Sequence, residues 1–176
     1  MLLFACTVDH LELLKRALAA GVDPNAADPM GEPALMKAAA FEHHPLVRCL
    51  IDAGANVDTR DAALGATALV IVAARGDTTV VDLLLRAGAD VDAVARGLEM
   101  NGVLHLPGET ALIAAAGRGH ADVVERLLAA GADARKSRSD GLGAAQVALD
   151  AGHQTISVRL HRASARTLSP VCLYAL

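Results

Sequence analysis

Histidine is the residue type in this chain that could most readily bind a metal ion or transfer a proton near neutral pH. His43 and His44 form the one adjacent pair. Neighbouring residues on a helix point about 100° apart, so these two rings would not close on the same metal ion. His10, His120 and His153 recur at the position that His43 occupies in a repeated pattern, and such recurrence indicates an architectural role. We therefore expect no metal site.

Cysteine offers no clearer chemistry. Cys6, Cys49 and Cys172 have no paired spacing of the kind that binds a metal ion or forms a redox motif. The sequence also contains no nucleophile elbow, no phosphate-binding glycine loop and no cluster of Cys and His. The acidic residues are scattered without an evident catalytic pairing. The sequence therefore predicts no catalytic residue, no cofactor and no enzyme activity. An ionisable group with a strongly perturbed pKa in a deep pocket would reopen that question.

The dominant feature of the chain is a short phrase that occurs four times. The first glycines of these phrases lie 33, 34 and 43 residues apart. A period near 33 residues is typical of a stack of identical supersecondary units, and it favours a binding function over catalysis. The four phrases are Gly21-Val22-Asp23-Pro24-Asn25, Gly54-Ala55-Asn56-Val57-Asp58, Gly88-Ala89-Asp90-Val91-Asp92 and Gly131-Ala132-Asp133-Ala134.

Each phrase is preceded by the pattern of two helices. A stripe of leucine and valine at helical spacing comes directly before it, as in residues 80–85 before Gly88. Farther upstream lies a shorter run rich in alanine, clearest at 67–74 and 110–116, and both of these runs open on threonine, a favourable N-cap. The glycine suits a helix end at positive φ. The expected unit is therefore a turn, an alanine-rich helix, a short turn, a leucine- and valine-rich helix and a glycine exit.

Several marks of these units match a known family. They are Gly65-x-Thr67-x-Leu69, Gly108-x-Thr110-x-Leu112, Gly119-His120 followed by Val123-Val124, and the glycine exits. With these marks the chain resembles an ankyrin repeat protein over roughly residues 1–160. The resemblance implies an all-α solenoid of helix-turn-helix units joined by β-turn or hairpin loops, with a partner protein bound on a concave surface.

The chain departs from that family at one position in the first helix of each repeat. The family often has Thr-Pro-Leu-His there, and its histidine links neighbouring repeats through hydrogen bonds. In this chain the histidine position holds Met36, Val70, Ile113 and Gln146. We therefore expect apolar packing in place of the polar link.

The repeats divide the chain into a domain at residues 1–160 and a tail at residues 161–176. The first repeat opens directly in a short helix at 2–7 with an apolar outer face, so either the start is truncated or this end packs against something. The last repeat is degraded, as expected of a C-terminal cap. The repeats span 1–23 (partial), 24–57, 58–91, 92–134 and 135–160 (capping), and the fourth contains a hairpin insertion at 94–107.

The excess length of the fourth repeat lies in the segment 98–107. Asn101-Gly102 is a strong signal for a two-residue hairpin turn, since both positions of that turn favour positive φ. The turn would place Met100 opposite Val103 and Glu99 opposite Leu104, with the preceding pair Leu98 and His105. Both faces would be largely apolar, so the hairpin is either a finger that inserts into a partner or an elongated loop that lies on its neighbours. Its candidate partner-binding residues are Leu98, Met100, Val103, Leu104, His105 and Leu106.

The resemblance also implies where the repeats would contact a partner. In the family, loop tips and exposed positions late in the first helix build the concave surface. Phe41, Arg75 and Arg118 occupy equivalent positions of successive repeats, so we expect them to form a line of interface anchors. The same transfer adds Pro29, Met30, Glu32, Ala63, Leu64, Ala66, Leu106, Glu109 and Asp150.

Charge and composition argue against two other classes of partner. The net charge is −4 and aromatic residues make up 2% of the chain, whereas a nucleic-acid surface needs a basic face and usually stacking aromatics. Residues 135–176 are basic, with 6 basic and 2 acidic side chains, which indicates either a solvated cap or contact with an acidic partner. No apolar run approaches the ~18 residues that span a bilayer. The abundance of alanine, and of arginine over lysine, resembles proteins of high-GC bacteria.

These observations predict a cytoplasmic, non-catalytic module that binds another protein of unknown identity, without nucleic acid or membrane. An alternative is a dedicated inhibitor or accessory subunit of an enzyme, in which the 98–107 finger enters the enzyme's cleft. An enzyme or a small-molecule binder is the class that the sequence favours least. Self-association through the apolar first helix or through the tail stays open.

Overall fold

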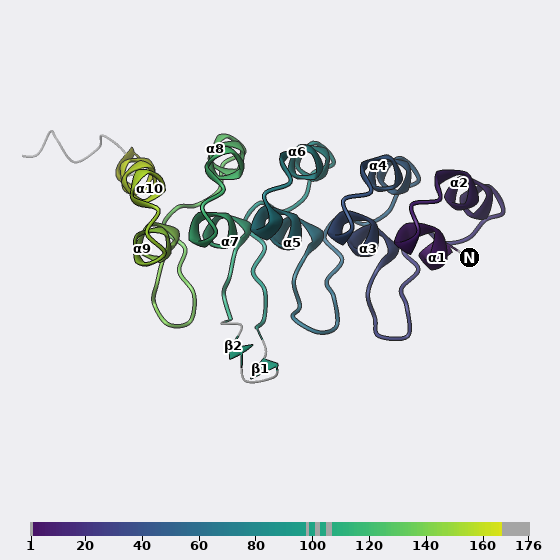
Figure 1. Cartoon of the computed structure of the whole chain (residues 1–176), viewed down its shortest axis with the longest axis horizontal. Helices are drawn as coiled ribbons and strands as arrows, with labels where there is room; N and C mark the ends of the chain where they lie inside the picture. The colour runs from purple at the N-terminus through teal and green to yellow at the C-terminus, as the bar shows by residue number, and fades with distance from the viewer. Residues whose placement is uncertain (1, 98, 101–102, 105–106, 167–176) are drawn as a thin grey trace, which may run out of the picture.

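The chain forms a row of stacked helix pairs, as the computed structural model shows for residues 2–97, 99–100, 103–104 and 107–166. The second helix of every pair lies in one row and the first helix in another, with loops extending from one edge (Figure 1). The prediction of an all-α solenoid is confirmed. Within the described residues the pairs are α1 (Leu2–Thr7) and α2 (Leu11–Ala19), α3 (Ala34–Ala40) and α4 (His44–Asp52), α5 (Ala68–Arg75) and α6 (Thr78–Arg86), α7 (Ala111–Gly117) and α8 (Ala121–Ala129), and α9 (Ala144–Asp150) and α10 (Gln154–Arg166).

Packing between neighbouring pairs follows from the two kinds of helix. The second helices bury one face of leucine and valine, as Leu84 does on α6 and Leu127 on α8. The first helices are rich in alanine, so α7 packs closely between α5 and α9. Met36, Val70 and Ile113 are buried at the positions where the family often has histidine, as expected, whereas Gln146 at the fourth such position is exposed and donates to Asp150 at 2.7 Å. The core therefore runs the length of the stack.

The short turn inside each pair explains why histidine recurs there. Gly119 has φ +81°, and a Cβ atom on it would lie 2.6 Å from the ring of His153. Gly76 has φ +84°, and its Cβ would lie 2.5 Å from the ring of His120, whose Nε2 is 3.1 Å from the carbonyl oxygen of Ala74. Each ring thus packs on the glycine of the preceding repeat. His120 and His153 are architectural residues, as their recurrence indicated.

The threonine caps predicted for the first helices form at one site of two. At α7, the amide of Ile113 donates to Thr110 Oγ1 at 3.3 Å. At α5, the Thr67 hydroxyl is buried and has no hydrogen-bond partner, so that part of the prediction is wrong. The backbone of the two threonines is nearly the same, with ψ values of 165° and 163°. The backbone of the turn therefore does not explain the difference.

The four glycine phrases build a ladder of hydrogen bonds across the repeats. The first Asn or Asp of a phrase accepts the amide two residues later, as Asp90 Oδ1 accepts from Asp92 at 3.0 Å. The second one reaches the next repeat: Asp58 Oδ1 accepts from the Asp90 amide at 2.9 Å, and Asp92 Oδ1 from the Asp133 amide at 3.0 Å. Directly after the fourth phrase, Arg135 stands at the position equivalent to Asp58 and Asp92, and its Nε pairs with Asp133 at 2.9 Å. The ladder accounts for the repetition of these residue types.

We expect Asp92→Ala to destabilise the fold by about 1–2 kcal/mol, since it leaves the half-buried amide of Asp133 without its charged acceptor. Asp92→Asn keeps an acceptor oxygen, like that of Asn25, which accepts from the Asn56 amide in the same ladder. It should change stability by less than about 0.5 kcal/mol. Urea denaturation followed by circular dichroism measures both variants. Equal losses for alanine and asparagine would mean that the ladder contributes nothing at this rung.

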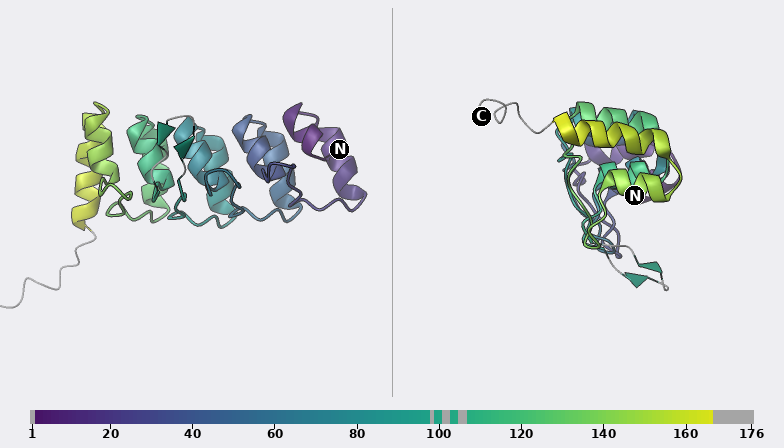
Figure 2. Two further views of the ribbon diagram at one scale, coloured as in Figure 1. Left: turned by 90° about the horizontal axis from the view of Figure 1, so that it is seen from below. Right: turned by 90° about the vertical axis from the view of Figure 1, so that its left-hand side faces the viewer.

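The insertion in the fourth repeat forms a hairpin with the predicted register. Strand β1 (Glu99–Met100) pairs antiparallel with β2 (Val103–Leu104), with Met100 opposite Val103 and Glu99 opposite Leu104. The predicted pair Leu98 and His105, and Leu106, lie outside the described residues. Both strands lie beyond the tips of the other loops (Figure 2). This placement favours a projecting finger over a loop that lies on its neighbours.

The base of this finger is tied to the loop of the preceding repeat. The amides of Arg96 and Gly97 both donate to the carbonyl oxygen of Leu64, at 2.9 and 3.2 Å. On the other side, the amide of Ala95 donates to the carbonyl oxygen of Glu109 at 2.9 Å. The finger is therefore held at its root by the third and fourth repeats together.

The last helix corrects the boundary drawn between domain and tail. Helix α10 begins at Gln154 and continues to Arg166, so the boundary at residue 160 falls inside it. Leu160 is fully buried, and Ile156 nearly so. The first six residues of the predicted tail thus belong to the last helix, and residues 167–176 lie outside the described part of the chain.

Candidate functional site

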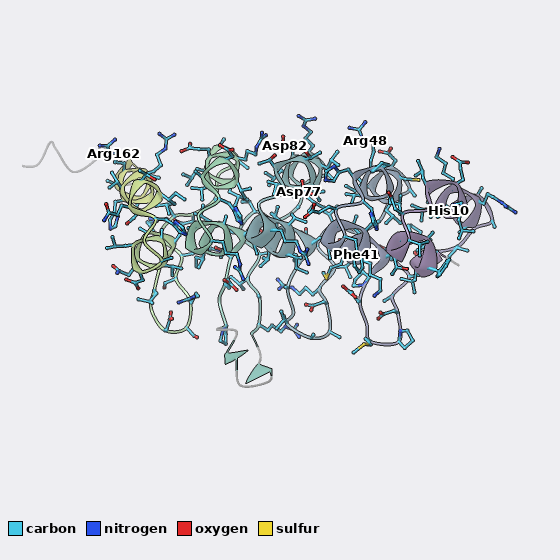
Figure 3. The ribbon with its side chains drawn as sticks, viewed as in Figure 1. His10, Phe41, Arg48, Asp77, Asp82 and Arg162 are labelled. Carbon is cyan, nitrogen blue, oxygen red and sulfur yellow. The ribbon has the colours of Figure 1, made fainter. Side chains whose placement is uncertain are left out.

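The line of anchors predicted on the first helices has a common structural position. Each of the three lies at the C-terminal end of the first helix of its repeat, eight residues after the N-cap: Phe41, Arg75 and Arg118. Phe41 is 55% exposed and stacks on the ring of His43, with centroids 5.8 Å apart. The counterpart in the last repeat is Ala151, so Asp150 was misaligned by one residue. Figure 3 shows Phe41 on the side of the first helices, opposite Arg48 on α4.

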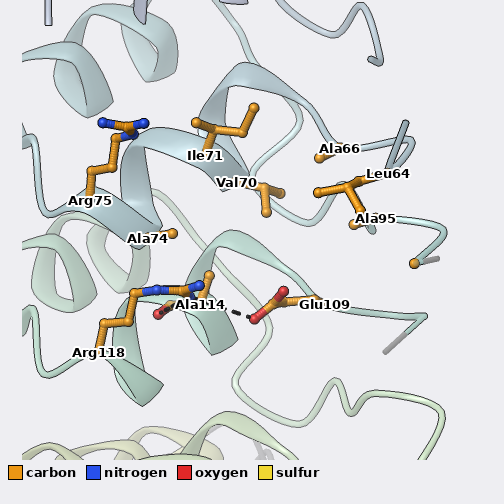
Figure 4. A pocket seen from close by; sticks show the side chains of 11 residues that line it. Leu64, Ala66, Val70, Ile71, Ala74, Arg75, Ala95, Glu109, Ala114 and Arg118 are labelled. Atoms are coloured by element: carbon orange, nitrogen blue, oxygen red, sulfur yellow. Dashed lines mark hydrogen bonds and ion pairs between the residues drawn. The ribbon is translucent and has the colours of Figure 1, made fainter. Parts of the chain in front are cut away.

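Five predicted residues meet in one pocket between the third and fourth repeats. A cavity of about 320 Å³, which opens beside α5 and α7 (Figure 4), is lined by Leu64, Ala66, Arg75, Glu109 and Arg118. Val70 and Ile71 of α5 supply much of its apolar wall. Pockets of about 300–1,000 Å³ with a mainly apolar lining and a few polar groups are typical binding sites. This pocket is therefore the candidate site.

The pocket exists because small side chains replace large ones at aligned positions. In the second repeat, Lys37 extends across the corresponding space, and its Nζ lies 2.8 Å from Asp28 and 2.7 Å from Glu32. In the fourth repeat the position of Lys37 is Ala114 and that of Asp28 is Ala95, and both alanines line the pocket. Aligning the repeats position by position would have revealed this change in size, which our sequence analysis missed.

Among the predicted contact residues whose burial the structure describes, Ala66 is the one that is buried instead of exposed. Only 2% of its surface is exposed, because it lines the pocket close to the packed ends of the loops. Ala66 therefore helps to shape the pocket but adds little exposed area to the surface that a partner would contact. Met30, at the tip of the second repeat's loop, is 82% exposed, as expected of a contact residue.

The charges at the pocket leave it positive. Arg118 Nη1 lies 3.9 Å from Glu109 Oε1, which is too long for a hydrogen bond, and 3.4 Å from the carbonyl oxygen of Ala114. Within the described part of the chain, the guanidinium of Arg75 has no hydrogen-bond or ion-pair partner. Two arginines and one glutamate line the pocket, so its mouth suits an anionic group.

At the equivalent place in the second repeat, Lys37 is paired with two carboxylates, those of Asp28 and Glu32. The ammonium group of Lys37 hydrogen-bonds Asp28 and so lowers the pKa of that carboxyl group. The same bond, with that to Glu32, raises the pKa of Lys37. Glu32 was predicted to contact a partner, but its carboxylate is already engaged. Of these two sets of charges, the one at the pocket therefore contains the arginine that is unpaired among the described residues.

The basic C-terminal end of the chain is largely neutralised within the fold. Arg135 hydrogen-bonds Asp133 and lowers the pKa of that carboxyl group to about 2. Arg138 lies 2.8 Å from Asp140, and Arg159 pairs with Glu125 of the preceding repeat. These pairs favour a solvated cap over a surface for an acidic partner.

Metal and thiol chemistry find little support in the geometry. Across residues 2–97, 99–100, 103–104 and 107–166, no three His, Cys, Asp or Glu side chains are grouped as a metal ion would need. Burial raises the pKa of the Cys6 thiol to about 11, which makes it a poor nucleophile. In the same described segments, no helix combines the length and apolar character that crossing a bilayer requires.

Comparison with known families and proteins identifies the repeats of this chain as ankyrin repeats. A family model of ankyrin repeats in three copies matches residues 2–95, and a single ankyrin repeat matches residues 107–138. The chain is 31% identical over 94 residues to the putative ankyrin repeat protein YahD of Escherichia coli, a match that covers 53% of this chain and 46% of that protein. It is 42% identical over 88 residues to the nuclear factor NF-kappa-B p105 subunit of Gallus gallus, covering 48% of this chain and 9% of that one.

One relative carries the name of an enzyme. The chain is 31% identical over 94 residues to glycerophosphocholine phosphodiesterase gde1 of Schizosaccharomyces pombe, but the match covers 8% of that protein. The chain thus spans less than half the length of each of these three relatives. The similarity concerns repeats and carries no argument for phosphodiesterase activity.

Proposed function

The chain belongs to the ankyrin repeat family, and from this premise we propose that it binds a partner protein through its concave surface and its hairpin finger. Ankyrin repeats generally mediate protein–protein interaction and are not catalytic. The observation that carries the proposal is the pocket between the third and fourth repeats, which unites Leu64, Arg75, Glu109 and Arg118. The partner, its pathway and a cytoplasmic, bacterial setting stay predictions.

The physical basis of the proposed binding is a surface that is ordered before the partner arrives. The ladder of hydrogen bonds between repeats and the close packing of alanine helices hold the pocket in place. A preorganised surface loses little conformational entropy on binding. Exposed arginine and aromatic side chains beside an apolar pocket are typical centres of interface energy. Arg75 and Arg118 are exposed arginines at this pocket, and Phe41 is an exposed aromatic residue at the equivalent position of the second repeat.

The experiment that tests the proposal is affinity capture from the extract of the source cells, read by mass spectrometry. The immobilised proteins are the wild type, Arg75→Ala with Arg118→Ala, and the matched control Arg48→Ala with Arg86→Ala, whose exposed arginines lie on the second helices. We expect to find a protein that the wild type and the control capture and that the Arg75→Ala, Arg118→Ala variant does not. Equal capture by all three would place the interface elsewhere and contradict the proposal.

Deleting the finger is expected to preserve the fold and to weaken capture of the same partner. Removal of residues 98–107 joins Gly97 to Gly108, two residues near the root of the hairpin, and restores the usual repeat length. The melting temperature, followed by circular dichroism, should change little because few core contacts are lost. Undiminished capture would mean that the finger does not touch the partner. If the partner proves to be an enzyme, its activity with and without the finger tests the inhibitor alternative.

A further inference from the structure

The chemistry of the pocket between the third and fourth repeats is specific enough to describe what it would bind. Its wall is apolar, with Val70, Ile71 and Leu64 among its members. Its charged members, Arg75, Arg118 and Glu109, sum to one positive charge. Figure 4 shows the two arginine side chains on one side of the pocket, with Leu64 and Ala95 on the other. An occupant therefore needs an apolar part and an anionic part next to each other.

The positive charge of this pocket is available to a ligand, unlike the charge of the second repeat. There, Lys37 contacts the two carboxylates Asp28 and Glu32 at hydrogen-bond distance. In the pocket, Arg118 lies 3.9 Å from its nearest carboxylate, and the guanidinium of Arg75 has no ion-pair partner among the described residues. A carboxylate placed between these two arginines would gain charge-assisted hydrogen bonds. A second cation would meet two like charges there.

We propose that this pocket is the anchor subsite for the partner protein and that it takes an aliphatic side chain followed by Asp or Glu in a segment of that partner. This inference rests on the proposed function, which it deepens by naming the chemistry of the partner. The aliphatic side chain lies against Val70 and Ile71, and the carboxylate lies between Arg75 and Arg118. The size of the pocket, about 320 Å³, is at the lower end of the range for binding sites and suits a short anchor segment.

Short peptides of defined sequence test the chemistry directly. The probes are acetylated and amidated Ala-Leu-Glu-Ala, Ala-Leu-Gln-Ala and Ala-Leu-Lys-Ala, titrated into the full chain with 13C-labelled alanine methyl groups. We expect the Leu-Glu peptide to shift the methyl signals of Ala74, Ala95 and Ala114, which line the pocket. The Leu-Gln peptide should bind about tenfold more weakly, which is about 1.4 kcal/mol, and the Leu-Lys peptide should give no saturable shift. Equal shifts for the three peptides, or none, would overturn the inference.

Filling the pocket provides an independent readout. Ala74 is half-buried and lines the pocket, so Ala74→Leu places a larger side chain in it. We expect this variant to lose the response to the Leu-Glu peptide. The matched control is Ala130→Leu, at the exposed C-cap residue that follows α8, and it should respond like the wild type. Retained binding by Ala74→Leu would overturn the proposed location.

Replacing both arginines by the uncharged residue glutamine keeps the test decisive if Ala74→Leu does not fold. Arg75→Gln with Arg118→Gln should remove the tenfold preference for the glutamate peptide over the glutamine peptide. A preference that survives would overturn the role of the arginines. The two proposals fail separately: a partner captured equally by wild type and Ala74→Leu defeats the subsite but leaves protein binding intact. A Leu-Glu response without any captured protein defeats protein binding and leaves the pocket chemistry intact.

Discussion

Replacing Leu127 by alanine is expected to lower the free energy of unfolding by about 2–5 kcal/mol, the largest loss that we predict for one substitution. Leu127 is fully buried on α8, where it belongs to the continuous core that joins the repeats. Natural domains are stable by only about 5–15 kcal/mol, so this change removes a large part of the total. Because each repeat is stabilised by its neighbours, the loss should uncouple the fourth repeat from the C-terminal cap.

Urea denaturation followed by circular dichroism measures the effect, and the chain offers a matched control. Leu149→Ala removes the same atoms from a side chain that is 45% exposed on α9. It should destabilise the fold by less than about 1 kcal/mol, since little apolar surface is lost from the core. A loss of the same size for both variants would contradict the continuous core. A broadened transition for Leu127→Ala would mark the separate unfolding of the C-terminal repeats.

Replacing Arg75 and Arg118 together by glutamate is expected to weaken the affinity for the captured partner by about a hundredfold or more. An arginine at the centre of an interface is worth about 2 kcal/mol or more, and the new carboxylates would also repel the anionic group that the pocket is proposed to hold. The fold should be preserved, since both side chains are exposed and neither has a close carboxylate partner among the described residues. Isothermal titration calorimetry with the purified partner measures the dissociation constant.

The control for this charge reversal has the same change in net charge on the other face. Arg48→Glu with Arg86→Glu alters exposed residues of α4 and α6. We expect it to change the affinity by less than about tenfold, mainly through the long-range field, and less so at higher salt. An equal loss in both double variants would show that overall charge, and not the pocket, determines the affinity.

Local signals in the sequence predicted the repeated unit and the hairpin well. Glycine exits and stripes of leucine and valine mark helix ends and buried faces within a few residues, so the helix pairs could be located. Asn101-Gly102 predicted the register of β1 and β2 because a two-residue turn determines which residues face each other. The end of α10 was placed too early. The segment between His161 and Arg166 contains neither glycine nor proline, so the sequence has no stop signal that would end the helix at residue 160.

The pocket required information that no single segment carries. It depends on alanines at positions 95 and 114 from two different elements, and on the contrast with the charged trio around Lys37 in another repeat. Only an alignment of the repeats combined with their stacking reveals that volume. The cap hydrogen bond is absent at Thr67 although its backbone resembles that of Thr110, so residue type and backbone conformation did not suffice to predict it. Loop and helix positions were thus predictable, whereas the spaces between them were not.

Site-specific photo-crosslinking tests the central claim, that a partner protein occupies the concave surface, most directly. Benzoylphenylalanine replaces Phe41, an exposed aromatic residue of that surface, in one protein and Arg48 on the opposite side in another. Both are irradiated in extract of the source cells and analysed by mass spectrometry. We predict a crosslinked protein with the label at position 41 and none with the label at position 48, and an excess of the Leu-Glu peptide should reduce the product. Crosslinking from position 48 alone, or from neither position, would contradict the account.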